Sequence, residues 1–309
     1  MRTPLRFVKG LVASVTLLAI LASAASSQAY QPTERVATVL KVKGTARIMV
    51  NGKPSPILVG QELKPGTDIQ TGADGAVDLR LGDSGENAAA TKRLSVGNPA
   101  AATIYRSEET APNVLHVFEN TIVGIQKLME METGGDKISE TELNLKAGKI
   151  LANVKKLSHA SHYEVKLPTG VAGIRGSTAV IGADGTIIML SGSAVISLVI
   201  PLSPGSSVTI TQTFTVGAGE AFNPALVIAA VQKAAAQANG GIPPSGSTAS
   251  PAVIAAAQGV ANTLANMPPN SLGSPVQPAP NVDYTMYQEI NTPTTLPGKD
   301  NTIIFVSPK

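Results

Sequence analysis

The chain has 309 residues, with 24 lysines and arginines against 21 aspartates and glutamates, no cysteine, no tryptophan and 3% aromatic residues. The absence of cysteine excludes disulfides and cysteine-based metal sites. Too few aromatic rings are present for a nucleic-acid surface, which needs a basic face and stacking side chains. Because no disulfide or cysteine-based metal site can stabilise the fold, stability must come from an apolar core.

The N-terminal segment has the order of a secretory signal peptide. Three basic residues precede an apolar run over 11–21, and small residues fill 22–29. We expect cleavage after Ala29, with Ala24 as the alternative, and a periplasmic or secreted mature chain. An uncleaved membrane anchor is the other interpretation, although about a dozen apolar residues fall short of the ~20 that span a bilayer. Without cysteine, no lipid-modified signal is expected.

Removal of this segment also changes the charge balance. Three of the 24 basic residues leave with it, so 21 remain against the 21 acidic ones. The mature chain is therefore expected to be neutral overall, with no nucleic-acid partner.

Between residues 36 and 219, short runs of β-forming residues alternate with turn signals, which predicts a β-rich domain. Asn51-Gly52 is typical of a type I′ hairpin. Pro65-Gly66 is typical of a type II turn in which Gly66 takes the second corner. A stretch from about 86 to 113, rich in Ala, Asn and Thr, is expected to be an irregular insertion.

The turn sequence Gly-Ala-Asp-Gly occurs twice, at 72–75 and at 182–185. Glycine supplies backbone freedom and aspartate a short acceptor, so both residues favour tight turns. We expect a hairpin at each copy. The residues expected to shape these turns are Gly72, Asp74, Gly75, Asp184 and Gly185.

After residue 219 the sequence changes to an Ala-rich pattern with helical signals. Asn223-Pro224 and Ser250-Pro251 each combine a polar N-cap with proline at the first helical position. They predict an Ala-rich helical hairpin over 222–267, which needs a surface to pack on. Residues 268–309 form a Pro-rich tail, expected to be extended. Its final apolar run, 302–306, is either a strand added to the main sheet or an anchor for another protein.

Two blocks of sequence resemble a known family. The first block runs through Val42–Ala46, Val59–Leu63, Pro65–Gly75 and Val77–Leu81, and the second through Leu145–Ile150, Val165–Gly170 and Val171–Ser177. In this order they resemble the FecR domain, the periplasmic module named for the ferric-citrate signal regulator. The second block is similar to its closing Thr-Pro…Arg-Gly-Thr signature, with Ser177 in place of threonine.

The resemblance covers about residues 36–197, half of the chain. It implies a mainly β module of packed sheets, arranged as a sandwich or with solenoid-like winding, that binds or relays rather than catalyses. In the regulators this module follows a transmembrane helix and a cytoplasmic segment that controls a sigma factor. This sequence offers neither element, so the resemblance implies a stand-alone exported member.

Arg175 is the sharpest candidate contact residue, because it stands in an apolar run close to Gly173 and beside Gly176. A guanidinium offers planar, bidentate donors to a partner or a ligand carboxylate. The alternative is an arginine that pins a turn through backbone carbonyls.

The histidines and clustered aspartates predict no metal site. His159 and His162 lack a third ligand nearby, and His116 lies in a strand pattern with no visible partner. Asp74, Asp78 and Asp83 lack the spacing of a calcium loop and are assigned to turns. No nucleophile elbow, phosphate-binding glycine loop or zinc helix occurs. We therefore expect no catalytic residue and no cofactor.

The sequence thus predicts a non-enzymatic, exported binding or scaffold module of the bacterial cell envelope. Its partner is expected to be another envelope protein or a surface polymer. An envelope signalling component that relays a stimulus to a membrane partner is the alternative. An enzyme of surface polysaccharides is a third possibility, because paired carboxylates for sugar hydrolysis are assembled in space rather than in sequence.

Overall fold

The computed structural model describes residues 32–50, 52–82, 113–133, 136–156, 158–245 and 247–280. The chain divides into two compact units, residues 1–31 and 32–309, and all described residues belong to the second. The predicted signal peptide and the terminal run 302–306 lie outside the described residues. So does the expected insertion, except for Asn113, which begins a strand.

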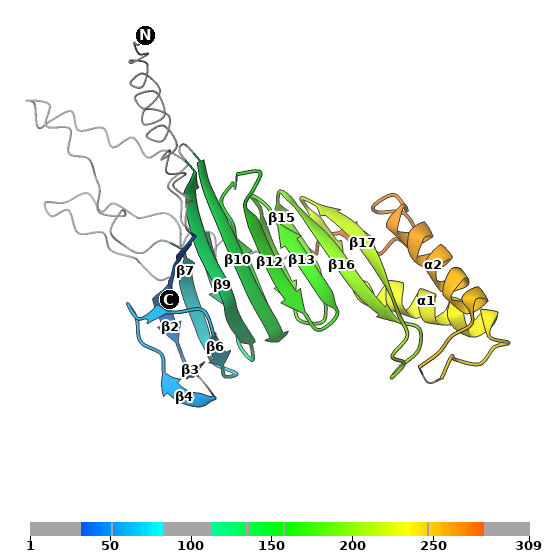
Figure 1. Cartoon of the computed structure of the whole chain (residues 1–309), viewed down its shortest axis with the longest axis horizontal. Coiled ribbons are helices and arrows are strands. Elements are labelled where there is room, and N and C mark those ends of the chain that lie inside the picture. Colours follow the sequence, from blue (N-terminus) through cyan, green and yellow to red (C-terminus); the bar gives the residue numbers. More distant parts are fainter. Residues whose placement is uncertain are drawn as a thin grey trace, which may run out of the picture. The chain divides into compact units, whose positions relative to one another are not determined.

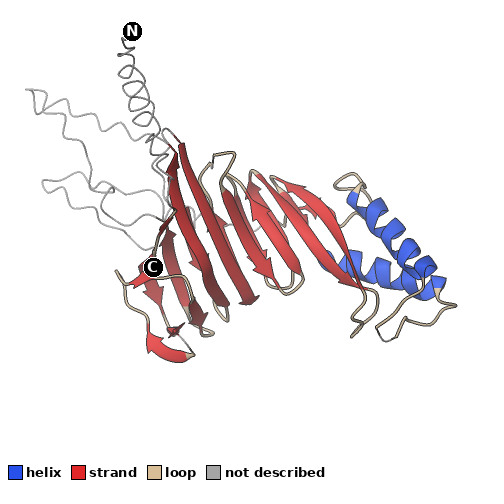
Figure 2. Cartoon of the chain, viewed as in Figure 1, coloured by secondary structure: helices blue, strands red, loops and turns tan. Residues whose placement is uncertain are grey.

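Two β-sheets make up most of the described chain, which confirms the prediction of a mainly β protein (Figures 1 and 2). The ten-stranded sheet contains, in spatial order, β17 (Thr209–Gly217), β16 (Ser193–Pro201), β13 (Gly170–Ile174), β12 (His162–Leu167), β10 (Asp136–Ala147), β9 (Ile122–Thr133), β6 (Thr67–Thr71), β3 (Ala46–Val50) and β4 (Lys53–Pro56), with β1 (Thr33–Glu34) beside β9.

The nine-stranded sheet contains β19 (Val276–Pro278), β18 (Glu220–Phe222), β15 (Ile187–Ser191), β14 (Thr178–Gly182), β11 (Lys149–Asn153), β8 (Asn113–Val117), β7 (Ala76–Leu81), β2 (Ala37–Lys43) and β5 (Glu62–Leu63). The described strand pairs are antiparallel, apart from the parallel pair β10–β12.

The chain passes back and forth between the two sheets. Strands β9 and β10 pair in the ten-stranded sheet, β11 joins the nine-stranded sheet, and β12 and β13 return to the first. Strands β14 and β15 then extend the second sheet before β16 and β17 extend the first. Each crossing carries the chain one step further along both sheets, as the colour order in Figure 1 shows.

The run 143–154 is divided by such a crossing. β10 ends at Ala147 in one sheet, and β11 begins at Lys149 in the other. Gly148 between them has φ +78°, and a Cβ there would lie 2.3 Å from Thr121 Oγ1. Only glycine fits this conformation without strain.

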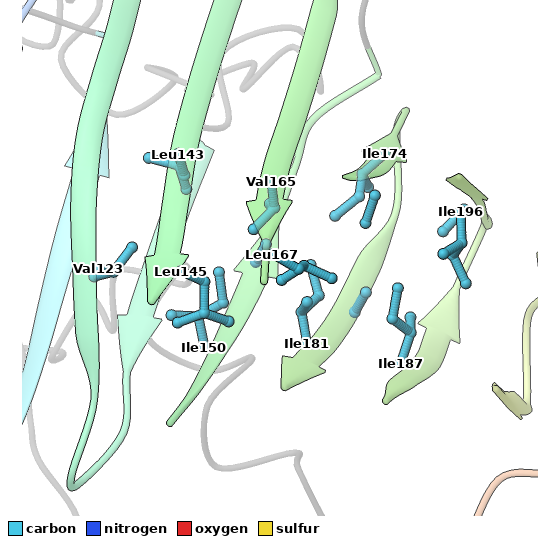
Figure 3. Packing of buried hydrophobic residues seen from close by; sticks show 14 of the residues in the cluster. Val123, Leu143, Leu145, Ile150, Val165, Leu167, Ile174, Ile181, Ile187 and Ile196 are labelled. Carbon is cyan, nitrogen blue, oxygen red and sulfur yellow. The ribbon is translucent and has the colours of Figure 1, made fainter. Parts of the chain in front are cut away.

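The apolar core lies between the sheets, since alternate residues of each strand point inward. Figure 3 shows buried residues from both sheets in one cluster: Val123, Leu143 and Val165 from the ten-stranded sheet, and Ile150 and Ile187 from the nine-stranded sheet. All five are fully buried. Burial of each such side chain contributes roughly 1.5–3 kcal/mol.

Two helices complete the core beside the last strands. α1 (Pro224–Ala238) and α2 (Pro251–Ala265) pack against each other, α1 also contacting β16 and α2 contacting β17. The side chain of Asn223 accepts a 3.0 Å hydrogen bond from the Ala225 N–H, which caps α1. The buried faces carry small residues, among them Ala257, so the helices approach each other closely. No helix in the described part of the chain is long and apolar enough to cross a bilayer.

The two Gly-Ala-Asp-Gly turns have different roles. The copy at 182–185 joins β14 to β15 within one sheet, as a hairpin. The copy at 72–75 is not a hairpin, because it carries the chain from β6 in one sheet to β7 in the other. Its Asp74 Oδ1 accepts a 3.2 Å hydrogen bond from the Thr45 N–H. Hydrogen bonds from the side chain and backbone of Thr45 hold the pKa of Asp74 below its usual value.

The loop before β6 has the features of a type II turn. Gly66 has φ +90°, and the Thr67 N–H donates to the Lys64 carbonyl over 3.2 Å. The Gly66 N–H donates to the Ile125 carbonyl over 2.7 Å, so this turn is also bonded to β9.

Candidate functional site

Charge is distributed very unevenly along the chain. Between residues 186 and 280, Glu220 and Lys233 are the only charged side chains. The described ion pairs all involve residues before 186, for example Lys146 Nζ with Asp68 Oδ2 at 2.6 Å. This asymmetry is visible in the sequence, but a net charge taken over the whole chain conceals it.

The outer face of the ten-stranded sheet shows the same division. Over β9, β10 and β12 it carries a charged face, composed of Lys127, Glu140, Glu142, Glu164 and Lys166. Lys127 Nζ lies 2.7 Å from Glu140 Oε1, and Lys166 pairs with Glu142. Charged side chains that pair across neighbouring strands keep a sheet face solvated.

Over β16 and β17 the outer face carries no charge at all. This uncharged face consists of Val195, Ser197, Val199, Thr209, Thr211, Thr213 and Thr215. Val195 is 48% exposed and Val199 39% exposed, and the four threonines are exposed as well. The register places Val195 opposite Thr215 and Val199 opposite Thr211. Apart from Ser197, the face is therefore an array of β-branched side chains in contact with solvent.

The inward residues of the same strands explain why this face is held in place. Ala194, Ile196 and Leu198 alternate with the exposed residues of β16 and are each 1% exposed. On β17, Phe214 is 2% exposed, and its ring lies 4.9 Å from that of Phe222, measured between centroids. The buried side therefore fixes which residues point outward.

Arg175 lies at the margin of the uncharged face. It follows the last residue of β13, and Gly173, two residues earlier, lies opposite Val195. The Arg175 side chain is exposed. Gly176 has φ +61°, which turns the chain away from the sheet at this point. The structure therefore brings the three predicted contact residues, 173, 175 and 176, next to the uncharged face.

Ser177 anchors this margin. Its buried hydroxyl accepts a 3.0 Å hydrogen bond from the Ser193 N–H. The same hydroxyl lies 2.9 Å from the Ser193 carbonyl and 3.0 Å from the Arg175 carbonyl, and it can donate to either. The turn that carries Arg175 is thus bonded to the first residue of β16.

His116 does have a partner, contrary to the sequence interpretation. It lies opposite Asp78 on the neighbouring strands β7 and β8, and His116 Nδ1 is hydrogen-bonded to Asp78 Oδ1. Both residues are buried. Asp78 is therefore a strand residue. The expectation that it belongs to a turn was wrong. The pair is separated by 38 positions in the sequence, so local pattern gives no sign of it.

The remaining candidates lie on or beside the charged face. His162 begins β12 and lies opposite Glu140, and Glu142 lies opposite Glu164 in the parallel register. These four side chains line a shallow depression. His159 lies in the loop before β12. In the described residues, no group of three or more acidic or histidine side chains is placed to hold a metal ion. Asp83 lies outside the described residues.

No family model matches the chain, and no curated protein matches it. Two crystal structures, at 2.50 Å and 1.65 Å resolution, of a protein from Parabacteroides distasonis ATCC 8503 described as a "putative anti-sigma factor" are similar to part of it. The identities are 12% and 14%, and the TM-scores 0.26 and 0.25. Each alignment covers 36% of this chain and 46% of the other, less than half the length of that protein. A likeness this low assigns neither a family nor a function.

Proposed function

We propose that the chain is an exported, non-enzymatic binding or scaffold protein of the bacterial cell envelope, built on a FecR-type β domain. Its partner-binding surface is the uncharged face, with Arg175 at the margin. The ordered sequence blocks support the family, and the N-terminal segment supports export.

The observation that carries the binding role is the exposure of Val195 and Val199 on a face without charge. Interface cores are depleted in charged residues and surrounded by polar rims. An exposed apolar patch on a soluble protein marks a contact site more often than an accident of surface composition. The partner we expect is therefore an envelope protein with an uncharged, apolar contact surface.

The helices and the margin fit the same role. The two helices pack against the strands that carry the uncharged face, since α1 contacts β16 and α2 contacts β17. A rigid support lowers the entropy cost of binding. Arg175 would then lie on the rim of the interface, where a guanidinium can reach a carboxylate or a carbonyl of the partner.

The test is cross-linking in the producing bacterium, followed by identification of the attached proteins. The full chain is compared with a V195K/V199K variant, which places two charges in the centre of the uncharged face. We expect the variant to lose the cross-linked partner, with affinity lowered by about tenfold or more, because a charge buried at an interface without a counter-ion is costly.

Val59→Lys is the matched control. Val59 is 65% exposed, more than either valine of the uncharged face, but it lies in the loop between β4 and β5. This variant should retain the partner. The proposal is wrong if the V195K/V199K variant keeps the same partner at the same yield, or if Val59→Lys loses it equally.

A further inference from the structure

Within the described part of the chain, the β16–β17 hairpin leaves one long strand edge without a neighbouring strand. β17 is the terminal strand of the ten-stranded sheet and runs for 9 residues. It contains neither proline nor a charged residue. A strand of this kind presents a row of backbone donors and acceptors with which another strand can pair.

The other edge strands in the described part of the chain are protected. β4 has 4 residues, of which Pro54 and Pro56 have no N–H to donate. β5 and β1 have 2 residues each, and β19 has 3 and ends in Pro278. Short strands and prolines are the usual protection against edge pairing. β17 has neither.

Hydrogen-bond alternation shows which backbone groups of β17 point to the open edge. In an antiparallel pair, residues that bond to the neighbour alternate with residues that point away. The Leu202 N–H donates to the Val208 carbonyl over 3.1 Å, in the same register as the rest of the pair. The even-numbered residues of β17 therefore bond to β16, and the odd-numbered ones face the edge.

Two further bonds agree with this assignment. The N–H of Val199, an odd-numbered residue of β16, donates away from β17 to the Thr169 carbonyl over 2.8 Å. The N–H of Gly217, at the end of β17, donates to Glu220 Oε2 over 2.7 Å and not to β16. The backbone groups of Thr209, Thr211, Thr213 and Thr215 are thus directed to the edge.

α2 contacts β17 through side chains on the inner side of the sheet. Gln212 belongs to the even-numbered, inward set, and Gln258 of α2 donates to its side-chain oxygen over 3.1 Å. α2 therefore lies over the inner side of β17. At the edge itself, the Thr213 carbonyl receives a long bond of 3.3 Å from the Gln212 amide. Within the described residues, no backbone group of another segment bonds to the edge.

We propose that β17 pairs antiparallel with β17 of a second copy, about a two-fold axis at Thr213. This pairing extends beyond the envelope partner proposed above and does not depend on it. Thr213 would lie opposite its own copy, and Thr211 opposite the second copy's Thr215. The threonines would then continue the outer face, where cross-strand Thr–Thr pairs are favourable. The absence of charge on β17 also means that the two copies bring no like charges together.

The alternative occupant is the terminal run 302–306, Thr-Ile-Ile-Phe-Val. It is apolar at consecutive positions, so as a strand it would place large apolar side chains on both faces. On the outer face, these large apolar side chains would lie beside the exposed threonines of β17, in contact with solvent. A second β17 instead matches both faces, with threonines outside and Ile210 and Phe214 inside.

Analytical ultracentrifugation of the purified full chain tests the pairing. We expect a dimer that Thr213→Pro weakens on the order of tenfold or more, because the proline removes an edge-directed N–H in both copies. The internal β16–β17 bonds do not use this N–H, so the circular dichroism spectrum should remain unchanged. Thr213→Val keeps the N–H and the β-branched shape and should remain a dimer.

A second variant keeps the test decisive if the proline disturbs folding. Thr213→Lys places two like charges opposite each other at the two-fold axis, and the resulting loss of dimer should recede as salt screens them. Ser197 lies on β16, opposite Thr213 and one strand away from the edge. Ser197→Lys adds the same charge there and should leave the dimer intact. A monomeric wild-type chain overturns the proposal. So does a dimer that survives both Thr213 variants, or one that is lost when residues 299–309 are deleted.

Discussion

The middle of the ten-stranded sheet and its β16–β17 end present different surfaces on one continuous framework. Over β9, β10 and β12 the outer face carries lysines and glutamates in cross-strand pairs, whereas over β16 and β17 it carries only valine, serine and threonine. Both regions bury the same kind of inward residues. Core packing therefore does not require the difference, which lies entirely in the solvent-facing residues. This difference is the basis of the contact surface proposed above at the uncharged end.

The largest expected effect comes from breaking the core under the uncharged end. Phe222 is fully buried and packs against Phe214 where the two sheets meet. Phe222→Ala should lower the free energy of unfolding by about 3–5 kcal/mol, since the cavity adds to the lost burial. Urea denaturation of the full chain measures this loss.

An exposed residue of the same end provides the control. Val195→Ala removes apolar atoms from solvent-exposed surface and should change stability by less than about 0.5 kcal/mol. If Phe222→Ala cost no more than this control, the uncharged end would not share the core described above.

How far the sequence predicts this arrangement depends on the range of the interaction. Alternating patterns and N-caps such as Asn223 act over a few residues, and they predicted a mainly β chain and the positions of two helices. The partner of His116 lies 38 positions away, and the turn at 72–75 connects two sheets, so neither follows from local pattern. A glycine-rich turn determines how the chain bends, but not which sheet receives the next strand.

The uncharged face was missed for a different reason. The information is present in the sequence as a long stretch with only Glu220 and Lys233 charged. The net charge of the whole chain averages the charged N-terminal part with the nearly uncharged stretch 186–280. The glycines beside Arg175 single it out in the sequence, but they do not predict the uncharged face next to which it lies.

The next largest effect is expected at Glu130 on β9, one of the strands that carry the charged face, and it depends on pH. Glu130 on β9 has a side chain only 9% exposed, with Arg35 Nε at 2.7 Å and Lys137 Nζ at 2.5 Å. Burial alone would raise its pKa, but the hydrogen bond and charge of Lys137, together with Arg35, hold the pKa of Glu130 below its usual value. Folding therefore favours the ionised carboxylate.

The sign of the pH effect follows from this lowered pKa. The stabilisation is fully present above the pKa of an unfolded glutamate, near 4.3, and is lost as pH falls through the lower folded value. Glu130→Gln should cost about 1–3 kcal/mol at neutral pH, and it should flatten the fall in stability between roughly pH 5 and pH 3. Denaturation at several pH values measures both. An unchanged pH slope in the variant would show that other carboxylates carry the dependence.

The smallest expected effect lies in the core beneath the charged face. Tyr163 begins the inward row of β12 and is 2% exposed. Burial raises the pKa of its hydroxyl, and in the described residues that hydroxyl has no hydrogen-bond partner. A buried polar group without a partner costs free energy that its removal restores. Tyr163→Phe should therefore leave stability unchanged or raise it by up to about 1 kcal/mol, measured by urea denaturation. Tyr163→Leu, which also shortens the side chain, should destabilise. A clear loss with phenylalanine would mean that the hydroxyl is bonded, and that the core beneath the charged face is held by a polar contact as well as by packing.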